Sequence, residues 1–457
     1  MSSGSRLSAL SALLWLAAAG CGKVTSATGG DAMPPMTDGG VLIDANMTPV
    51  AVTVLTTAGD GKPDATAKVV FQDPDGVVVA DLMVDAQGHA QSPLPRGGSV
   101  TAVAQSTSGA SVTAAATTIT GVVPGDTLTF GQAAQPGVPQ GGQTSMTVTF
   151  PLAPDATLYS FSTPCGTTKT GSSPAPLNFR DSCHGATFDL LGTTIADGVP
   201  MYVRLANVTY QAGNSFAVPT AFAPMPSYTV TAHNVPAEVS SMSVSRASLA
   251  GNLAVSSTSA IVPGDPPAGN VSVNIPFPAG FGTRSELDVI MGRADAAIPQ
   301  HVEVHTAALG TSADVDVAPQ PLPWITNFAQ TATGATWTQV AAGDGSGTAM
   351  LTWTGTWSAG GTTYTGTRTL VRPLSGVTNS MILSPLPATY MAIDPVQQSV
   401  VVTLSSASLV MGNYDMANSD AQIRQMPQIL LTDPAGNMGA LLGKPFQRRI
   451  VSAAIVH

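Results

Sequence analysis

The sequence predicts an all-β protein made of several β-sandwich modules in tandem. Charged residues are only 10% of the 457-residue chain, well below the roughly 25% of ordinary globular domains. Few lysines and glutamates leave few strong helix formers for a helical surface. Apolar residues instead alternate with Thr and Ser, and turn residues recur at roughly 8–12-residue spacing, which is typical of sandwiches and barrels.

The first 20 residues have the order of a secretory signal peptide. Arg6 is basic, residues 7–19 are mostly apolar, and small residues lead directly into Cys21. The apolar run is shorter than the roughly 20 residues that a spanning helix needs. Residues 18–21 (AAGC) resemble a bacterial lipobox, with alanine where leucine is usual. The resemblance implies lipidation of Cys21 after cleavage; an ordinary secretory signal is the alternative.

Residues 21–48 predict a disordered, flexible tether that carries the lipidated cysteine. They are rich in Gly, Ser, Thr, Asp and Pro and show no sustained apolar period. Composition shifts divide the remaining chain into further parts. These are a β-sandwich at 49–130, a linker at 131–144, a β-sandwich with a disulfide at 145–235, a β-rich region at 236–320, and a β-rich, Trp-containing C-terminal domain at 321–457.

The first module begins where the apolar period changes to two. Val50, Val52 and Val54 alternate with other residues, and two turn signals follow, DPDG at 73–76 and DAQG at 85–88. The pattern V-x-V…G-x-P…A-x-V-x-F-x-D-x-D-G…D-x-x-G resembles prealbumin-like modules, the carboxypeptidase regulatory-like sandwiches of bacterial surface proteins. The resemblance implies architecture only. For 73–76 a turn is predicted, and a calcium loop is the alternative.

Two cysteines remain once Cys21 is assigned to the lipid anchor. Cys165 and Cys183 are predicted to form a structural disulfide, because an oxidising compartment lets such a pair persist. The segment between them is rich in Gly, Pro and Ser, which predicts a long loop leading into a strand. A zinc site is disfavoured because a second, closely spaced ligand is missing.

His301, Glu303 and His305 form the candidate metal site. On a strand these three alternate residues share one face, and two imidazoles with a carboxylate suit zinc or another transition metal. The alternative is the polar face of an amphipathic strand whose intervening valines face the core. We therefore expect no bound metal, and these three residues are the weak candidate for a metal site.

Trp353, Trp357 and Tyr364 form the candidate ligand-binding group. Leu351, Trp353 and Trp357 share one face of a predicted strand, and threonines occupy the other face. Exposed aromatic rings would offer an apolar platform for sugars. The alternative, which the composition favours, is that the tryptophans lie in the core of a sandwich.

Charge and missing motifs limit the function classes. A net charge of −10 without a basic stripe argues against nucleic-acid binding. The chain contains no G-x-S-x-G, P-loop or dinucleotide-binding motif, so we expect no cofactor and no enzyme. A polysaccharide hydrolase, whose carboxylate pair has no sequence signature, is one alternative, and a purely structural spacer is another.

The whole chain resembles the large surface lipoproteins of myxobacteria and related Gram-negative bacteria. The lipobox, the tether and the low-charge Ig-like or prealbumin-like β modules carry the resemblance. It implies a cell-envelope protein, anchored in the membrane through Cys21, that is periplasmic or surface-exposed. Gly22 replaces the aspartate linked to inner-membrane retention, so the outer membrane is expected. The predicted role is non-enzymatic binding or adhesion, with an envelope protein or a glycan as partner.

Overall fold

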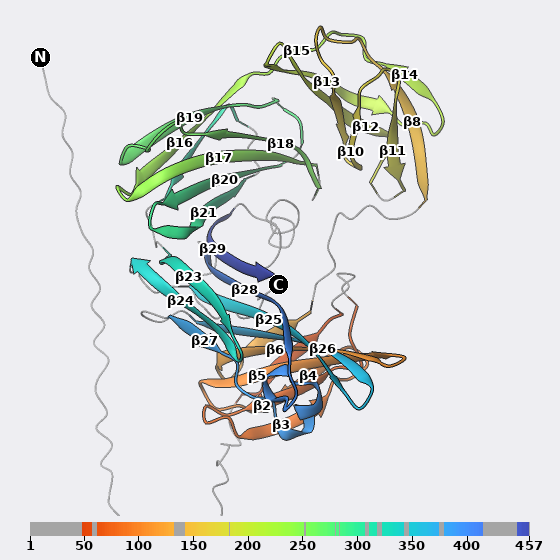
Figure 1. The fold of residues 1–457 in the computed structure, drawn as a ribbon. Coiled ribbons are helices and arrows are strands. Elements are labelled where there is room, and N and C mark those ends of the chain that lie inside the picture. The colour runs from red at the N-terminus through yellow and green to blue at the C-terminus, as the bar shows by residue number, and fades with distance from the viewer. Residues whose placement is uncertain are drawn as a thin grey trace, which may run out of the picture. The chain divides into compact units, whose positions relative to one another are not determined.

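The chain is all-β, as predicted, in a computed structural model (Figure 1). The structure describes residues 48–456 apart from 57–61, 132–141, 182, 251–252, 279, 283, 307–309, 318–321, 342–346, 374–378 and 415–445. Within this part the helical elements are two short 3-10 helices, η1 (Ala388–Ile393) and η2 (Pro395–Gln397). No described helix is long and apolar enough to cross a membrane. Cys21 and the tether lie outside the described residues.

A 12-stranded sheet joins segments that are far apart in the sequence. The pairing that joins its N-terminal strands to the rest of the sheet is parallel, with Thr118 of one strand opposite Leu370 of another. Its strands, in spatial order, are β18 (Leu253–Ile261), β17 (Val239–Ala250), β20 (Arg284–Arg293), β21 (Ala296–Thr306), β29 (Phe446–Val456), β28 (Thr403–Tyr414), β25 (Thr348–Ala359), β26 (Thr362–Pro373), β6 (Ser111–Val122), β5 (Gly98–Ser108), β2 (Lys68–Gln72) and β3 (Val78–Met83).

Three small sheets each pack against a different part of this large sheet. Each interface is a core of alternating apolar side chains, so the strands obey the period of two that the sequence shows. The small sheets, each in spatial order, are β4 (His89–Ser92), β1 (Val50–Val54) and β7 (Thr127–Phe130); β19 (Gly269–Pro276), β16 (Ser227–Val235) and β22 (Ser312–Asp316); and β23 (Trp324–Thr331), β24 (Gly334–Ala341) and β27 (Ser380–Ile382).

Residues 143–224 form a sandwich with two sheets of its own. Its core is rich in aromatic side chains, among them Phe150, Tyr159, Phe161 and Phe179. The strands are β10 (Gly166–Thr170), β9 (Tyr159–Thr163), β12 (Thr187–Ala196), β13 (Val199–Thr209) and β15 (Ala223–Pro224) in one sheet, and β11 (Ala175–Arg180), β8 (Gln143–Thr149) and β14 (Ser215–Ala217) in the other.

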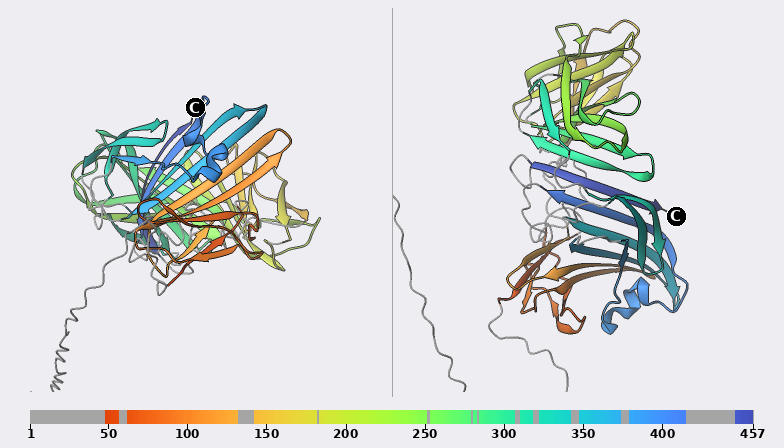
Figure 2. Two further views of the ribbon diagram at one scale, coloured as in Figure 1. Left: turned by 90° about the horizontal axis from the view of Figure 1, so that it is seen from below. Right: turned by 90° about the vertical axis from the view of Figure 1, so that its left-hand side faces the viewer.

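Residues 383–398 form a covering segment that contains η1 and η2 and lies on β26 and β6. One face of this part of the large sheet packs on the β4–β1–β7 sheet through Phe71 and Val100. The opposite face carries Val70 and Val103, which pack with Leu386 and Tyr390 of the covering segment. Figure 2 shows the helical turns of this segment beside the strands of the sheet. Both faces of the sheet are therefore covered at this point.

The predicted domain boundaries remain predictions, but strand pairs join several of the predicted parts. β16 lies inside the predicted 145–235 module, yet it pairs with β19 and β22 of the following region. Strand β6 of the 49–130 module pairs with β26 of the C-terminal region. Sequence-local module boundaries therefore do not correspond to separate sheets in this chain.

Candidate functional site

A pocket of about 230 Å³ lies where the covering segment meets the end of strands β2, β5 and β6. The turn after β2, with Asp73, forms one wall, and Gly97 and Gly98 before β5 lie beside it. Arg368 of β26 and residues 383–386 of the covering segment form the opposite side. The pocket is therefore assembled from five stretches of chain, residues 72–76, 97–101, 118–120, 368–370 and 383–386.

Asp73 is buried in this wall, with 4% of its surface exposed. One carboxylate oxygen, Oδ1, accepts hydrogen bonds from the backbone N–H of Asp75 at 3.0 Å and of Val77 at 2.8 Å. The other oxygen, Oδ2, is buried and has no hydrogen-bond partner among the described residues. An unsatisfied buried acceptor costs about 1–3 kcal/mol, and more when it is charged.

The turn itself does not require this burial, because the chain builds the same turn a second time in an exposed place. Asp85 Oδ1 accepts from the backbone N–H of Gln87 at 2.9 Å and of His89 at 2.8 Å. Both turns have a glycine at positive φ in the fourth position, Gly76 and Gly88. The Asp85 side chain is 53% exposed. The burial of Asp73 is therefore not needed to form this type of turn.

Arg368 lies in the pocket lining and is 3% exposed. Its Nη1 donates to Asp394 Oδ1 at 2.6 Å, and its Nη2 donates to the backbone oxygen of Ser384 at 2.9 Å. The third donor group, Nε, is buried and has no partner in the described part of the chain. The fully buried Asp394 balances the charge of this guanidinium. Asp73 therefore gives the pocket a net negative charge.

Hydroxyl groups and apolar side chains complete the lining. Thr101 and Thr118 lie opposite each other on β5 and β6, and their hydroxyls are 2.9 Å apart. Thr120 also lines the pocket. Leu383 and Leu386 of the covering segment are buried apolar neighbours of these polar groups. An apolar lining with a few placed polar groups is the usual composition of a small-molecule site.

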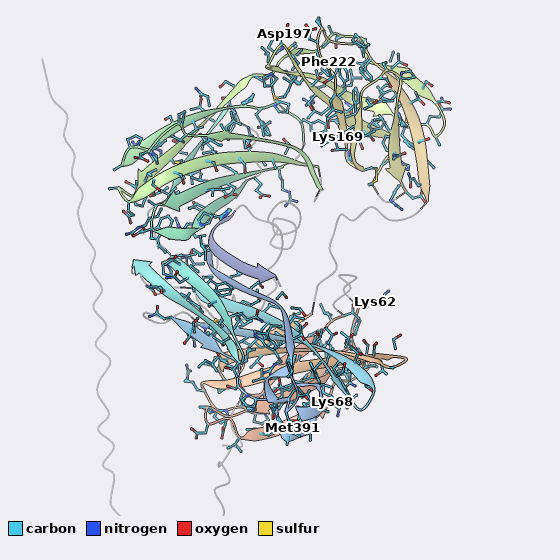
Figure 3. All side chains as sticks on the ribbon, viewed as in Figure 1. Lys62, Lys68, Lys169, Asp197, Phe222 and Met391 are labelled. Atoms are coloured by element: carbon cyan, nitrogen blue, oxygen red, sulfur yellow. A yellow bond between two sulfur atoms is a disulfide. The ribbon has the colours of Figure 1, made fainter. Side chains whose placement is uncertain are left out.

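Tyr390 helps to hold the covering segment over the pocket. Its hydroxyl donates to Asp81 Oδ1 of β3 at 2.6 Å, and the Nζ of Lys68 lies 5.6 Å from its ring centroid. Figure 3 labels Lys68 and Met391 in this part of the molecule. Burial and the neighbouring carboxylate of Asp81 raise the pKa of Tyr390 well above its usual range. The hydroxyl therefore stays protonated and remains a donor at physiological pH.

A second buried arginine, Arg246 of β17, lies against aromatic rings. Its guanidinium carbon lies 3.5 Å from the ring centroid of Tyr228 and 3.9 Å from that of Phe277. Burial lowers the pKa of Arg246. Because aromatic rings lie close against the guanidinium, this site is a packing feature of the sandwich core.

The metal candidate is only partly described. His301 is half-buried, and its Nδ1 lies 3.1 Å from Asp288 Oδ2 on the neighbouring strand β20. Glu303 and His305 belong to the same strand, β21, but their side chains lie outside the described residues. In the described part of the chain, no three His, Cys, Asp or Glu side chains are grouped to hold a metal ion. The metal candidate stays a prediction.

The sugar-platform interpretation of the aromatic group is corrected by burial. Trp353 is 0% exposed and Trp357 is 4% exposed, so neither ring offers a face to a ligand. Tyr364 is half-buried and stacks on Trp357, with centroids 5.3 Å apart. The rings have room because Gly355 and Gly366, paired across β25 and β26, lack side chains. The core interpretation therefore describes the tryptophans.

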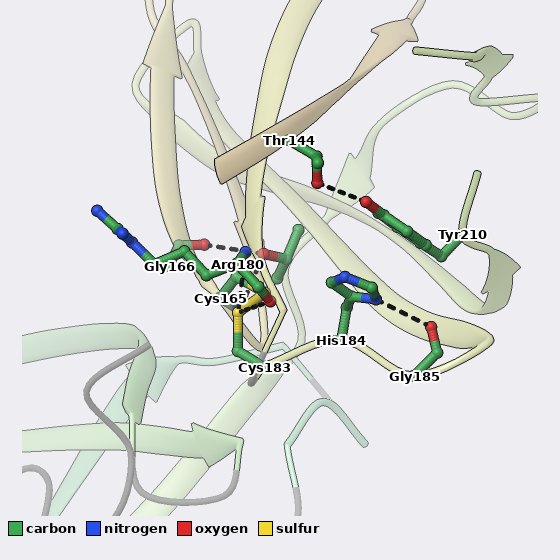
Figure 4. The surroundings of a disulfide bond; sticks show 9 residues. Thr144, Cys165, Gly166, Arg180, Cys183, His184, Gly185 and Tyr210 are labelled. Atoms are coloured by element: carbon green, nitrogen blue, oxygen red, sulfur yellow. Dashed lines mark hydrogen bonds between the residues drawn. A yellow bond between two sulfur atoms is a disulfide. The ribbon is translucent and has the colours of Figure 1, made fainter. Parts of the chain in front are cut away.

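Cys165 and Cys183 form a disulfide (Figure 4). Cys165 precedes β10 in one sheet of the 143–224 sandwich, and Cys183 follows β11 in the other. The bond therefore ties the two sheets together. The intervening segment was expected to be a long loop leading into a strand, but it contains two strands, β10 and β11. The side chains of His184 and Tyr210 stack next to the bond, with centroids 3.7 Å apart.

Removing this disulfide is expected to destabilise the 143–224 sandwich. Chain entropy for a loop of this length, with a sequence separation of 18, gives about 3 kcal/mol. The measurement is chemical denaturation of the Cys165→Ser, Cys183→Ser double variant against the unmodified chain, with the reduced unmodified chain as control. Equal denaturation midpoints for the oxidised chain and the variant would contradict the expectation.

Sequence reasoning missed the polar pocket, although one signal for it is present in the sequence. Arg368 occupies a position of β26 that alternates with Gly366 and Leu370 on the inward face of the strand. An arginine on an inward face requires a buried partner. That partner, Asp394, lies in a segment without sandwich periodicity, so pattern analysis alone could not identify it.

Comparisons with known proteins assign the chain to no family. No family model matches the sequence, and no curated protein matches it. Among solved structures, the chain is weakly similar to the pilus adhesin SpaC from Lactobacillus rhamnosus GG in its open conformation. The identity is 12%, the match covers 73% of this chain and 44% of the adhesin, and the TM-score is 0.14. The chain thus spans less than half of the adhesin, and a likeness this weak supports no argument about function.

Proposed function

We propose that this chain is a non-enzymatic, lipid-anchored protein of the cell envelope that binds a ligand through its β-sandwich array. The observation that carries the binding role is the pocket beneath the covering segment. Thr101, Thr118 and Thr120 line it beside the apolar side chains of Leu383 and Leu386, and Asp73 and Arg368 are the charged residues of its lining. An apolar lining with a few placed polar groups is the usual composition of a small-molecule site, and this composition supports a binding role.

The envelope location rests on sequence features that the described residues do not include. The lipobox-like residues 18–21 support anchoring at Cys21, and Gly22 supports the outer membrane. The disulfide between Cys165 and Cys183 supports an oxidising, extracytoplasmic compartment. Anchoring at Cys21 would leave the β modules free to meet a glycan or an envelope protein.

Replacing Cys21 with serine is expected to release the protein from membranes. Serine cannot receive the thioether-linked lipid, so the protein loses its apolar anchor. The measurement is the distribution between membrane and soluble fractions after expression in a Gram-negative host, with Cys165→Ser as a matched control that keeps the anchor. A Cys21→Ser protein that still partitions wholly with membranes would contradict the proposal.

Glycan-array binding of the full chain tests the binding role and separates it from the alternatives. The proposal expects retention of specific glycans with no products released from them. Release of shortened glycans would establish a hydrolase and overturn the non-enzymatic part. Absence of any retained glycan or envelope protein would favour a structural spacer.

A further inference from the structure

We infer that the free edge of strand β3 binds an extended segment of another protein in which apolar residues alternate with lysine or arginine. Such a segment adds to the sheet as a further strand, the mode called β-augmentation. Among the described residues, none of β3 lines the pocket, so the inference goes beyond the proposed ligand site. Three properties of β3 carry it: its outward backbone groups, its exposed apolar side chains and the charge around it.

Strand β3 is the last strand at one end of the 12-stranded sheet, and β2 is its neighbour among the described strands. Just beyond the strand, Val84 N donates to Ala67 O, and antiparallel ladders alternate hydrogen-bonded with non-bonded pairs. Counting back along this register places Met83 and Asp81 in non-bonded pairs with β2. Their backbone N–H and C=O groups therefore point away from β2, where an added strand can bond them.

The edge carries exposed apolar side chains. Val77, Val78 and Met83 are between 42% and 56% exposed. Met391 is also exposed, on the covering segment that contacts β3 through the Tyr390 hydroxyl (Figure 3). Natural edge strands are usually protected by charges, proline or a covering element, and methionines are common at adaptable binding surfaces. An apolar edge left open in this way is typical of an interaction site.

The charge around the edge favours a basic partner. Residues 68–88 carry four aspartates and one lysine, and Asp75, Asp81 and Asp85 among them are exposed. The Nζ of the lysine, Lys68, lies 5.6 Å from the ring centroid of Tyr390. Lysine or arginine at alternate positions of an added strand would meet carboxylates, and cross-strand pairs of opposite charge stabilise a sheet.

The same charge disfavours a second copy of this chain as the occupant. Two β3 edges brought together would place the exposed aspartates of one copy near those of the other. Like charges across paired strands destabilise the pairing. A basic segment of another protein avoids this repulsion and is therefore the favoured occupant.

Fluorescence anisotropy with the full lipidated chain in a non-ionic detergent tests the inference. The probe is a short labelled peptide of alternating lysine and valine. One control peptide has glutamate in place of lysine, and another has proline in place of the central valines, which prevents a regular strand ladder. We expect the lysine–valine peptide to bind at least about tenfold more tightly than either control, with an affinity that falls as salt is raised.

The Met83→Pro variant identifies the edge. The Met83 N–H points away from β2, so proline removes a donor to the added strand and leaves the β2 ladder in place. Peptide affinity is expected to fall at least about tenfold, and chemical denaturation checks that the variant folds. Val78→Lys, which adds a cation to the edge without a backbone change, should also weaken binding. Val401→Lys makes the same change at an exposed valine before β28 and should leave binding unchanged.

The outcomes distinguish the inference from its alternatives. No binding of the lysine–valine peptide, or equal binding of the glutamate–valine peptide, would overturn it. Binding that Met83→Pro and Val78→Lys leave unchanged would place the peptide elsewhere and refute the assignment to β3. A dimer in sedimentation velocity that Met83→Pro dissociates would identify a second copy as the occupant and would also overturn it. Glycan retention on the array does not depend on β3, so the proposed function stands or falls separately.

Discussion

Replacing Asp394 with alanine is expected to lower the free energy of unfolding by about 3–5 kcal/mol, the cost of breaking a buried ion pair. The carboxylate is fully buried. It accepts hydrogen bonds from Arg368 Nη1 at 2.6 Å, Leu386 N at 2.8 Å, Val396 N at 3.2 Å and Gln397 Nε2 at 2.7 Å. Alanine would leave the Arg368 cation buried without its partner.

Chemical denaturation of the two proteins measures this change. Asp314→Ala is the matched control, because Asp314 also pairs with a basic side chain, His233 at 2.9 Å, but is 74% exposed. An exposed pair contributes about 0–1 kcal/mol, so this variant should unfold close to the unmodified chain. Equal destabilisation by the two substitutions would contradict the central role of Asp394 in holding the covering segment.

Replacing Trp353 with alanine is expected to cost about 3–5 kcal/mol, the range for truncating a large buried aromatic side chain. Trp353 is the largest fully buried side chain among the described residues. Its ring packs in the core beneath the β23–β24–β27 sheet, and its Nε1 donates to the backbone oxygen of Thr331 at 3.1 Å. Alanine would therefore leave both a cavity and a lost hydrogen bond.

Thermal unfolding followed by circular dichroism measures this effect without relying on tryptophan fluorescence. Val401→Ala serves as the control, since Val401 is 89% exposed and exposed substitutions usually change stability by less than about 0.5 kcal/mol. The glycan-binding profile of Trp353→Ala should persist at temperatures where the variant is folded. Selective loss of glycan binding without loss of stability would restore the sugar-platform interpretation.

Local features of the fold could be predicted from the sequence because local chemistry determines them. The DPDG turn at 73–76 follows from an aspartate that accepts backbone N–H bonds and a glycine at positive φ. The period-two alternation around Val52 predicts a strand with one buried face. The pairing of Cys165 with Cys183 follows from their being the two cysteines left after the lipobox.

Long-range features could not be predicted. The parallel pairing of β6 with β26 brings residues such as Thr118 and Leu370 together across a large separation in sequence, and no local pattern encodes it. Strand β10 was missed because it lies at a sheet edge with alternately exposed and half-buried residues. It therefore has no apolar stripe to detect.

The residues of the candidate site likewise combine local features that the sequence predicts with long-range contacts that it does not. Asp73 was identified as a turn residue, which is correct, but its second role depends on the covering segment that lies opposite it. Arg368 lies among the threonines of β26, and its function becomes visible only with Asp394 in place. The pocket forms only where segments distant in sequence come together. Single-sequence reasoning could therefore identify individual lining residues but not the pocket.

A crystal structure of the full chain, soaked with a glycan that the array retains, tests the central claim most directly. The account predicts difference density for that glycan in the pocket lined by Asp73, Thr118 and Leu386. Density for ordered water alone in the pocket, or a glycan bound at another place, would contradict it.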